Sequence, residues 1–148
     1  MSTLSNKLYV VDTNVWLALL STTHNSHNSS MAWFETLGTG CAGMCRPVQL
    51  ALIRLLGNRT VMGAVALSAS QAWQHIQLLM EDERIEFLRE PDRVDDVLPT
   101  LFRYPVPTPQ LISDAHLAAF SMACGRCLVT RDRGFQQFRG LDVEILGD

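Results

Sequence analysis

Three aspartates in separate parts of the chain are the residues best able to carry out chemistry together. Asp12 directly follows the apolar run 7–11, Asp132 comes just after the apolar run 127–130, and Asp114 lies at the start of a predicted helix. The carboxyl ends of parallel strands meet at one edge of an α/β sheet, where ligands bind. We therefore expect the three carboxylates to converge at that edge.

Converging carboxylates need a positive counterion. At a separation of about 4 Å and an effective dielectric constant of about 20, each pair repels by about 4 kcal/mol. Oxygen ligands without histidine or cysteine at metal-ligand spacing favour Mg²⁺ or Mn²⁺ over zinc. Such an ion activates water and neutralises charge that develops on a phosphate. The three aspartates thus predict a Mg²⁺ site, with Mn²⁺ as the alternative ion, suited to phosphate chemistry.

Each aspartate taken alone also has a purely structural interpretation. Asp12 could cap a helix, Asp114 could lie in the first turn of its helix, and Asp132 could begin a turn that continues into Gly134. The placement of all three at one edge of the predicted sheet is what favours a shared metal.

Short apolar strands alternate with helices along the chain, which predicts an α/β domain around a mainly parallel sheet. Strands are predicted at residues 7–11, 41–45, 85–88, 127–130 and 143–146. Helices are predicted at residues 15–20, 31–37, 47–56, 70–81, 92–104 and 112–124. Loops are expected at 21–30 and 58–67, and a stiff extended link at Pro105, Pro107 and Pro109.

Length and composition are those of one globular domain that spans residues 1–148. The chain is 47% hydrophobic, so it can bury a core. It shows neither an apolar run long enough to span a bilayer nor a signal peptide, and we expect a cytoplasmic protein without membrane contact. A net charge of −3 argues against a protein that coats nucleic acid non-specifically.

Cysteines and histidines are expected to lie outside the metal site. Two close cysteine pairs raise the alternative of zinc, but their small and apolar neighbours favour buried core residues: Cys41, Cys45, Cys124 and Cys127. His27 is expected to have a structural role near a helix start. His116 follows Asp114 by two residues and is expected to point elsewhere on its helix.

Three segments of the chain resemble, in order and spacing, the signature segments of PIN-domain proteins, in particular the VapC-type toxins of prokaryotic toxin–antitoxin pairs. The segments are Asp12-Thr13-Asn14, Ser113-Asp114-Ala115 and 128–135 (LVTRDRGF), and the resemblance extends over residues 9–146. It implies a PIN-like three-layer α/β/α fold with a short, mainly parallel sheet. It also implies a Mg²⁺-dependent endoribonuclease, an antitoxin protein as partner, and a homodimer.

The resemblance also implies roles for individual residues. Asp12 and Asp114 would be the principal metal ligands, and Asp132 would complete the acidic pocket. Three further side chains would orient the carboxylates through hydrogen bonds: Asn14, Ser113 and Thr130.

Gln49 departs from the family pattern, because many members carry a glutamate at this point. A subgroup of the toxins has glutamine here followed by an arginine, which is Arg54 in this chain. Gln49 can offer a carbonyl oxygen to the site but no charge. We therefore expect one well-held metal ion, with any second ion recruited by the substrate phosphate.

Hydrolysis of RNA phosphodiester bonds is the leading hypothesis. The alternative is a catalytically weak or inactive PIN-like module that binds RNA or a protein partner, which Gln49 and the acidic net charge motivate. Phosphoryl transfer through an aspartyl-phosphate is less favoured, because Asn14 stands two residues after Asp12, and Lys7 is the only lysine. The apolar surface of the helices within residues 70–104 is the expected dimer interface.

Overall fold

The computed structural model describes residues 3–103 and 109–147. Its five strands form one parallel sheet in the order β3-β2-β1-β4-β5. The strands are β1 (Tyr9–Val11), β2 (Ala42–Cys45), β3 (Ile85–Leu88), β4 (Cys127–Thr130) and β5 (Val143–Ile145). The predicted strands and their parallel arrangement are confirmed, with ends shifted by one or two residues at most.

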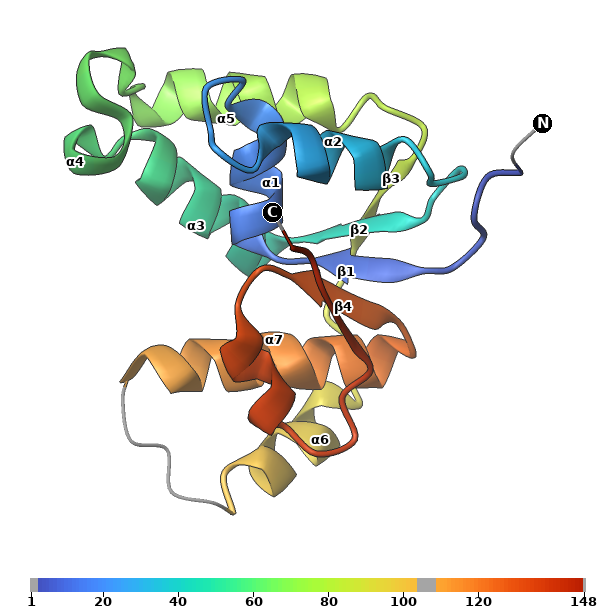
Figure 1. Ribbon diagram of the computed structural model, residues 1–148. Helices are drawn as coiled ribbons and strands as arrows, with labels where there is room; N and C mark the ends of the chain where they lie inside the picture. The colour runs from blue at the N-terminus through green and yellow to red at the C-terminus, as the bar shows by residue number, and fades with distance from the viewer. Residues whose placement is uncertain (1–2, 104–108, 148) are drawn as a thin grey trace.

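Helices cover both faces of the sheet, which confirms the three-layer α/β/α architecture. Figure 1 shows α1, α2, α3 and α5 on one side and α6 and α7 on the other. The helices are α1 (Thr13–Leu20), α2 (His27–Phe34), α3 (Arg46–Leu56), α4 (Arg59–Met62), α5 (Ala69–Leu79), α6 (Val94–Leu101) and α7 (Pro109–Cys124). Within the described residues, no helix is both long enough and apolar enough to cross a membrane.

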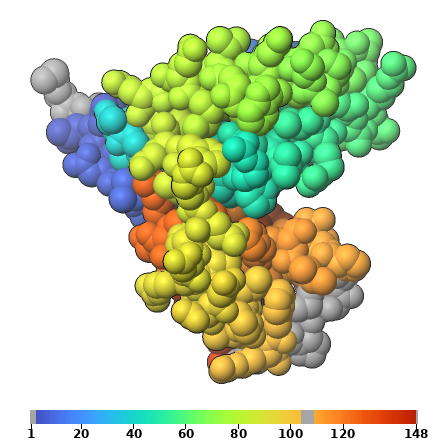
Figure 2. Space-filling model, turned by 180° about the vertical axis from the view of Figure 1, so that it is seen from behind, coloured from blue at the N-terminus to red at the C-terminus, as the bar shows by residue number. Residues whose placement is uncertain are grey.

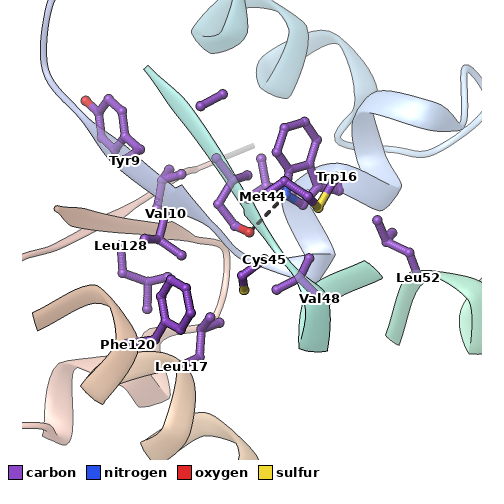
Figure 3. Packing of buried hydrophobic residues seen from close by; sticks show 14 of the residues in the cluster. Tyr9, Val10, Trp16, Met44, Cys45, Val48, Leu52, Leu117, Phe120 and Leu128 are labelled. Atoms are coloured by element: carbon purple, nitrogen blue, oxygen red, sulfur yellow. Dashed lines mark hydrogen bonds between the residues drawn. The ribbon is translucent and has the colours of Figure 1, made fainter. Parts of the chain in front are cut away.

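The central strand β1 is buried on both faces, as its continuous apolar sequence requires. Figure 3 shows Trp16 and Met44 on one side of the strands and Leu117 and Phe120 on the other. The indole Nε1 of Trp16 donates a hydrogen bond of 2.9 Å to the carbonyl oxygen of Val11. This bond fixes α1 against the end of β1, so it also fixes the strand-to-helix turn at which Asp12 lies.

Several element boundaries differ from the sequence prediction. The helix α2 begins at His27 instead of residue 31, and a ring nitrogen of His27 hydrogen-bonds to the carbonyl oxygen of Ala18 at 2.8 Å. The loop predicted at 58–67 contains α4 and a 3-10 helix, η1 (Gly63–Val65). α6 ends at Leu101, three residues before the predicted end, which lies outside the described residues.

The start of α7 matters for the site. Pro109 is the first residue of this helix, where proline is favoured, so it does not belong to the predicted extended link. Pro105 and Pro107 lie outside the described residues. Asp114 consequently lies in the second turn of α7, so the expected position in the first turn is corrected.

The cysteines are free thiols, and three of them are buried as expected: Cys41, Cys45 and Cys127. Cys124 is only half-buried, because it is the last residue of α7. Burial raises the pKa of the Cys45 thiol to about 11, so this thiol is protonated at neutral pH and packs as an apolar group.

Candidate active site

Asp12 joins the end of β1 to the start of α1. Its Oδ1 accepts a hydrogen bond of 2.7 Å from the backbone N–H of Thr13, so it caps α1. Its Oδ2 accepts a bond of 2.6 Å from the hydroxyl of Thr130, the last residue of the neighbouring strand β4. Asp12 is only 9% exposed. The helix cap and the predicted place at the sheet edge are therefore properties of the same side chain.

The other two aspartates reach the same edge from β4 and α7. Asp132 follows β4, and its Oδ1 accepts a bond of 2.8 Å from the backbone N–H of Gly134. Asp114 lies on α7, where its Oδ1 accepts a bond of 3.3 Å from the side-chain amide of Gln110. Asp132 is exposed and Asp114 is half-buried, so both carboxylates remain accessible to a ligand.

All three aspartates line one cavity of about 420 Å³, as their convergence at the sheet edge predicts. The wall opposite α7 is formed by α3 along most of its length, and Figure 2 shows the notch between this region and the start of α7. The side chains from α3 are Pro47, Val48, Ala51, Arg54 and Leu55. The side chains from α7 are Gln110, Ser113, Asp114, His116 and Leu117.

Electrostatic coupling links the three carboxylates. Burial, reinforced by the nearby charges of Asp114 and Asp132, raises the pKa of Asp12 from 3.8 to about 6. Hydrogen bonds from Thr130 and Thr13 act in the opposite direction but do not cancel this rise. Burial and the charge of Asp132 also raise the pKa of Asp114. A positive charge among these groups would lower their pKa values and stabilise the ionised site.

The donor set fits a hard divalent cation. Three carboxylates with hydroxyl and amide oxygens at the cavity wall offer the ligands that Mg²⁺ and Mn²⁺ prefer. In the described part of the chain, no three His, Cys, Asp or Glu side chains are placed closely enough to chelate an ion as they stand. Asp114 and Asp132 bond to Gln110 and Gly134 instead, so chelation requires their side chains to rotate.

Thr130 and Asn14 form the polar network beneath the carboxylates. The hydroxyl of Thr130 is fully buried; it donates to Asp12 and accepts a bond of 3.0 Å from the backbone N–H of Asp132. The side-chain amide of Asn14 donates to the Thr130 hydroxyl, and its oxygen accepts from the backbone N–H of Arg131. These bonds connect β1 to the loop after β4. Ser113 lines the cavity, but its predicted orienting role stays a prediction.

Gln49 is not among the residues that line the cavity, and its expected supporting role stays a prediction. It is 2% exposed, on the core-facing side of α3. Its Oε1 accepts a hydrogen bond of 2.8 Å from the guanidinium of Arg46. As a neutral amide, Gln49 brings no negative charge to this part of the site.

Several cavity residues were not among the predicted site residues, including Arg54, Gln110 and His116. Helical spacing could have found the first two, because Arg54 shares a face with Pro47 and Ala51, and Gln110 precedes Asp114 by four residues. His116 was expected to point elsewhere on its helix, yet it contributes to the cavity lining. Its Nε2 pairs with the carboxylate of Glu90. These residues are far apart in the sequence, and no local pattern predicts the contact.

The raised pKa of Asp12 predicts a pH-dependent stability. The folded chain binds this proton more tightly than the unfolded chain, so the contribution of Asp12 to the free energy of unfolding falls as pH rises from about 4 to 6. Asp12→Asn should therefore gain up to about 2 kcal/mol relative to the parent protein across this window. Denaturant unfolding in metal-free buffer from pH 4 to 8 measures the difference. The control Asp95→Asn, on an exposed position of α6, should follow the parent; a constant difference for Asp12→Asn contradicts the assignment.

Comparison with known proteins identifies the family. The PIN domain family matches residues 9–141. Ribonuclease VapC41 of Mycobacterium tuberculosis (strain CDC 1551 / Oshkosh) is 37% identical over 144 residues, which cover 94% of this chain and 99% of that protein. Ribonuclease VapC37 of M. tuberculosis (strain ATCC 25618 / H37Rv) is 26% identical over 139 residues, 89% of this chain and 92% of that protein.

Solved structures agree with this assignment at the level of the fold. VapBC2 from Rickettsia felis, bound to a promoter DNA fragment, superposes with a TM-score of 0.66 at 14% identity, covering 95% of this chain and 99% of that chain. VapC20 from M. tuberculosis, described as a sarcin-ricin loop cleaving toxin, gives a TM-score of 0.63 at 16% identity, covering 86% and 92% of the two chains. The resemblance seen in the signature segments is confirmed, and the chain belongs to the PIN domain family, within its VapC group.

Proposed function

We propose that the chain is a metal-dependent endoribonuclease that hydrolyses RNA phosphodiester bonds and acts as the toxin of a toxin–antitoxin pair. The observation that carries this proposal is the shared cavity of Asp12, Asp114 and Asp132, which come from β1, α7 and β4. The ribonuclease names of its VapC relatives support the same reaction. We further propose the cytoplasm as its location, in keeping with a reaction on cellular RNA.

The chain's own groups prepare the cavity for this chemistry. Asp12 and Asp114 would hold a Mg²⁺ or Mn²⁺ ion, and Asp132 would complete the acidic wall. When bound, the ion supplies Lewis-acid activation of water and neutralises charge on the phosphate. Thr130 fixes the orientation of Asp12 through its 2.6 Å bond. Above pH 6 Asp12 is mostly ionised, so a ligand carboxylate is present at neutral pH.

The charges in the cavity favour one resident ion. Three carboxylates and the guanidinium of Arg54 leave two net negative charges, which one divalent cation balances. Gln49 contributes no charge, and its Oε1 is hydrogen-bonded to the guanidinium of Arg46. A second ion would therefore need the substrate phosphate as an additional ligand.

Removing a ligand carboxylate should abolish RNA cleavage. Mutation of a residue that only hydrogen-bonds to a metal ligand typically lowers metal affinity or activity by about 10- to 100-fold. Loss of a ligand itself should cost more, so Asp12→Asn and Asp114→Asn should each lower the cleavage rate by more than about 100-fold. Cleavage of end-labelled RNA in Mg²⁺ measures this rate, and Asp95→Asn is the matched control that should cleave normally. Parent-like cleavage by both cavity variants would overturn the nuclease proposal.

A PIN-like module that binds without cutting is the second candidate, and the inward-facing Gln49 favours it. Metal binding separates the two. If the site holds an ion, a concentration ten times the dissociation constant raises the free energy of unfolding by about 1.4 kcal/mol. Melting temperatures across millimolar Mg²⁺ and Mn²⁺ should therefore rise for the parent and stay constant for Asp114→Asn. An unchanged parent melting temperature supports the binding module.

We propose an antitoxin protein and a second copy of the chain as partners. Several structural neighbours are VapBC complexes, including one from Salmonella typhimurium bound to DNA.

Large apolar side chains are exposed on α3 and α5: Leu50, Trp73 and Leu78. Burying them between two copies would remove apolar surface from water. Light scattering should give a dimer mass that Leu78→Glu shifts towards the monomer, and a monomeric parent across micromolar concentrations excludes the homodimer.

A further inference from the structure

Building on the proposed nuclease function, we propose that Arg54 is the residue that binds the substrate phosphate in this cavity. Arg54 lies on the exposed side of α3 and lines the same cavity as the three aspartates, on the wall opposite Asp114. Its guanidinium would donate paired hydrogen bonds to the non-bridging oxygens of an RNA phosphate. The substrate backbone would then lie between the acidic wall and α3.

Arg54 lacks the hydrogen-bond and ion-pair partners that several other basic residues of the fold have. Within residues 3–103 and 109–147, Arg54 forms no hydrogen bond or ion pair, although it shares a cavity with three carboxylates. Other basic side chains near carboxylates are already paired, namely Arg84 with Asp82, Arg126 with Glu86 and His116 with Glu90. Arg46 stacks over Trp73 and Phe87 and donates to Gln49. Among the cavity residues that the structure describes, Arg54 is the one arginine or lysine.

The acidic wall makes such a cation necessary. An RNA phosphate that approaches the carboxylates is repelled at close range, and the chain's net charge of −3 supplies no general attraction. One divalent ion leaves one of the three carboxylate charges unbalanced, and the incoming phosphate adds a further negative charge. Since residue 49 is a glutamine, it supplies no fourth carboxylate that would help to hold a second ion. The Arg54 guanidinium offsets one of these negative charges and offers paired donors to the phosphate oxygens without a second ion.

Neighbouring residues hold the backbone of Arg54 in position. Arg54 lies between Ala51 and Leu55 on the cavity face of α3, and the adjacent turns of this helix are anchored by Leu52 and Leu56, which are buried. The helix is thus fixed against the core while its opposite side faces the cavity. The long arginine side chain can adjust to the phosphate without movement of the backbone.

Binding of a short single-stranded RNA, followed by fluorescence anisotropy in EDTA, tests the proposal apart from catalysis. Arg54→Ala should weaken binding by about 10-fold and reduce the slope of log affinity against log salt by about 0.7, as expected for the loss of one phosphate contact. Arg54→Lys should retain the slope. The control Lys7→Ala removes one positive charge at the opposite edge of the sheet and should retain affinity and slope.

The outcomes separate this proposal from the nuclease proposal. The role of Arg54 is overturned if Arg54→Ala binds RNA with the affinity and salt slope of the parent. It is also overturned if Lys7→Ala lowers RNA affinity and salt slope as much as Arg54→Ala does. The same holds if the parent does not bind RNA in EDTA. If Asp12→Asn and Asp114→Asn lose cleavage while Arg54→Ala keeps full RNA affinity, only the Arg54 proposal fails. A melting temperature of Arg54→Ala equal to that of the parent shows that the variant is folded.

Discussion

Repulsion among carboxylates at the carboxyl edge of the sheet is the constraint on which the rest of the structure depends. The sheet brings Asp12, Asp114 and Asp132 to one cavity, and burial with mutual repulsion raises the pKa of Asp12 to about 6. A rise of this size corresponds to about 3 kcal/mol against the ionised form. The surrounding fold must supply enough stability to hold this arrangement, and it does so with apolar strands buried on both faces.

The groups that hold the site also hold the fold. Asp12 caps α1 and Asp132 caps the 3-10 turn after β4, so the structural and functional interpretations of these residues are both correct. The hydroxyl of Thr130 donates to the carboxylate of Asp12 and accepts from the backbone N–H of Asp132. The side chain of Asn14 connects this hydroxyl to the loop after β4. A substitution in this network changes stability and site geometry together. Binding and unfolding must therefore be measured beside activity for every variant.

The sequence predicted the parts of the site that depend on local pattern. An apolar strand followed by an aspartate and a helix places the carboxylate at the sheet edge, and parallel strands bring such edges together. Which side of α3 faces the cavity was not predictable, because its core and cavity faces are adjacent. Gln49 was therefore assigned to the site, and Arg54 was not. The pairing of His116 with Glu90 joins α7 to the segment after β3, and a single sequence contains no signal for such a contact.

Anomalous diffraction from crystals grown with Mn²⁺ can establish whether the three aspartates form one binding site for one divalent ion, because the signal both locates and counts the ion. We expect a single anomalous peak in the cavity, within coordination distance of the carboxylates of Asp12 and Asp114. Two peaks of similar occupancy in the absence of RNA, or no peak in the cavity, would contradict it.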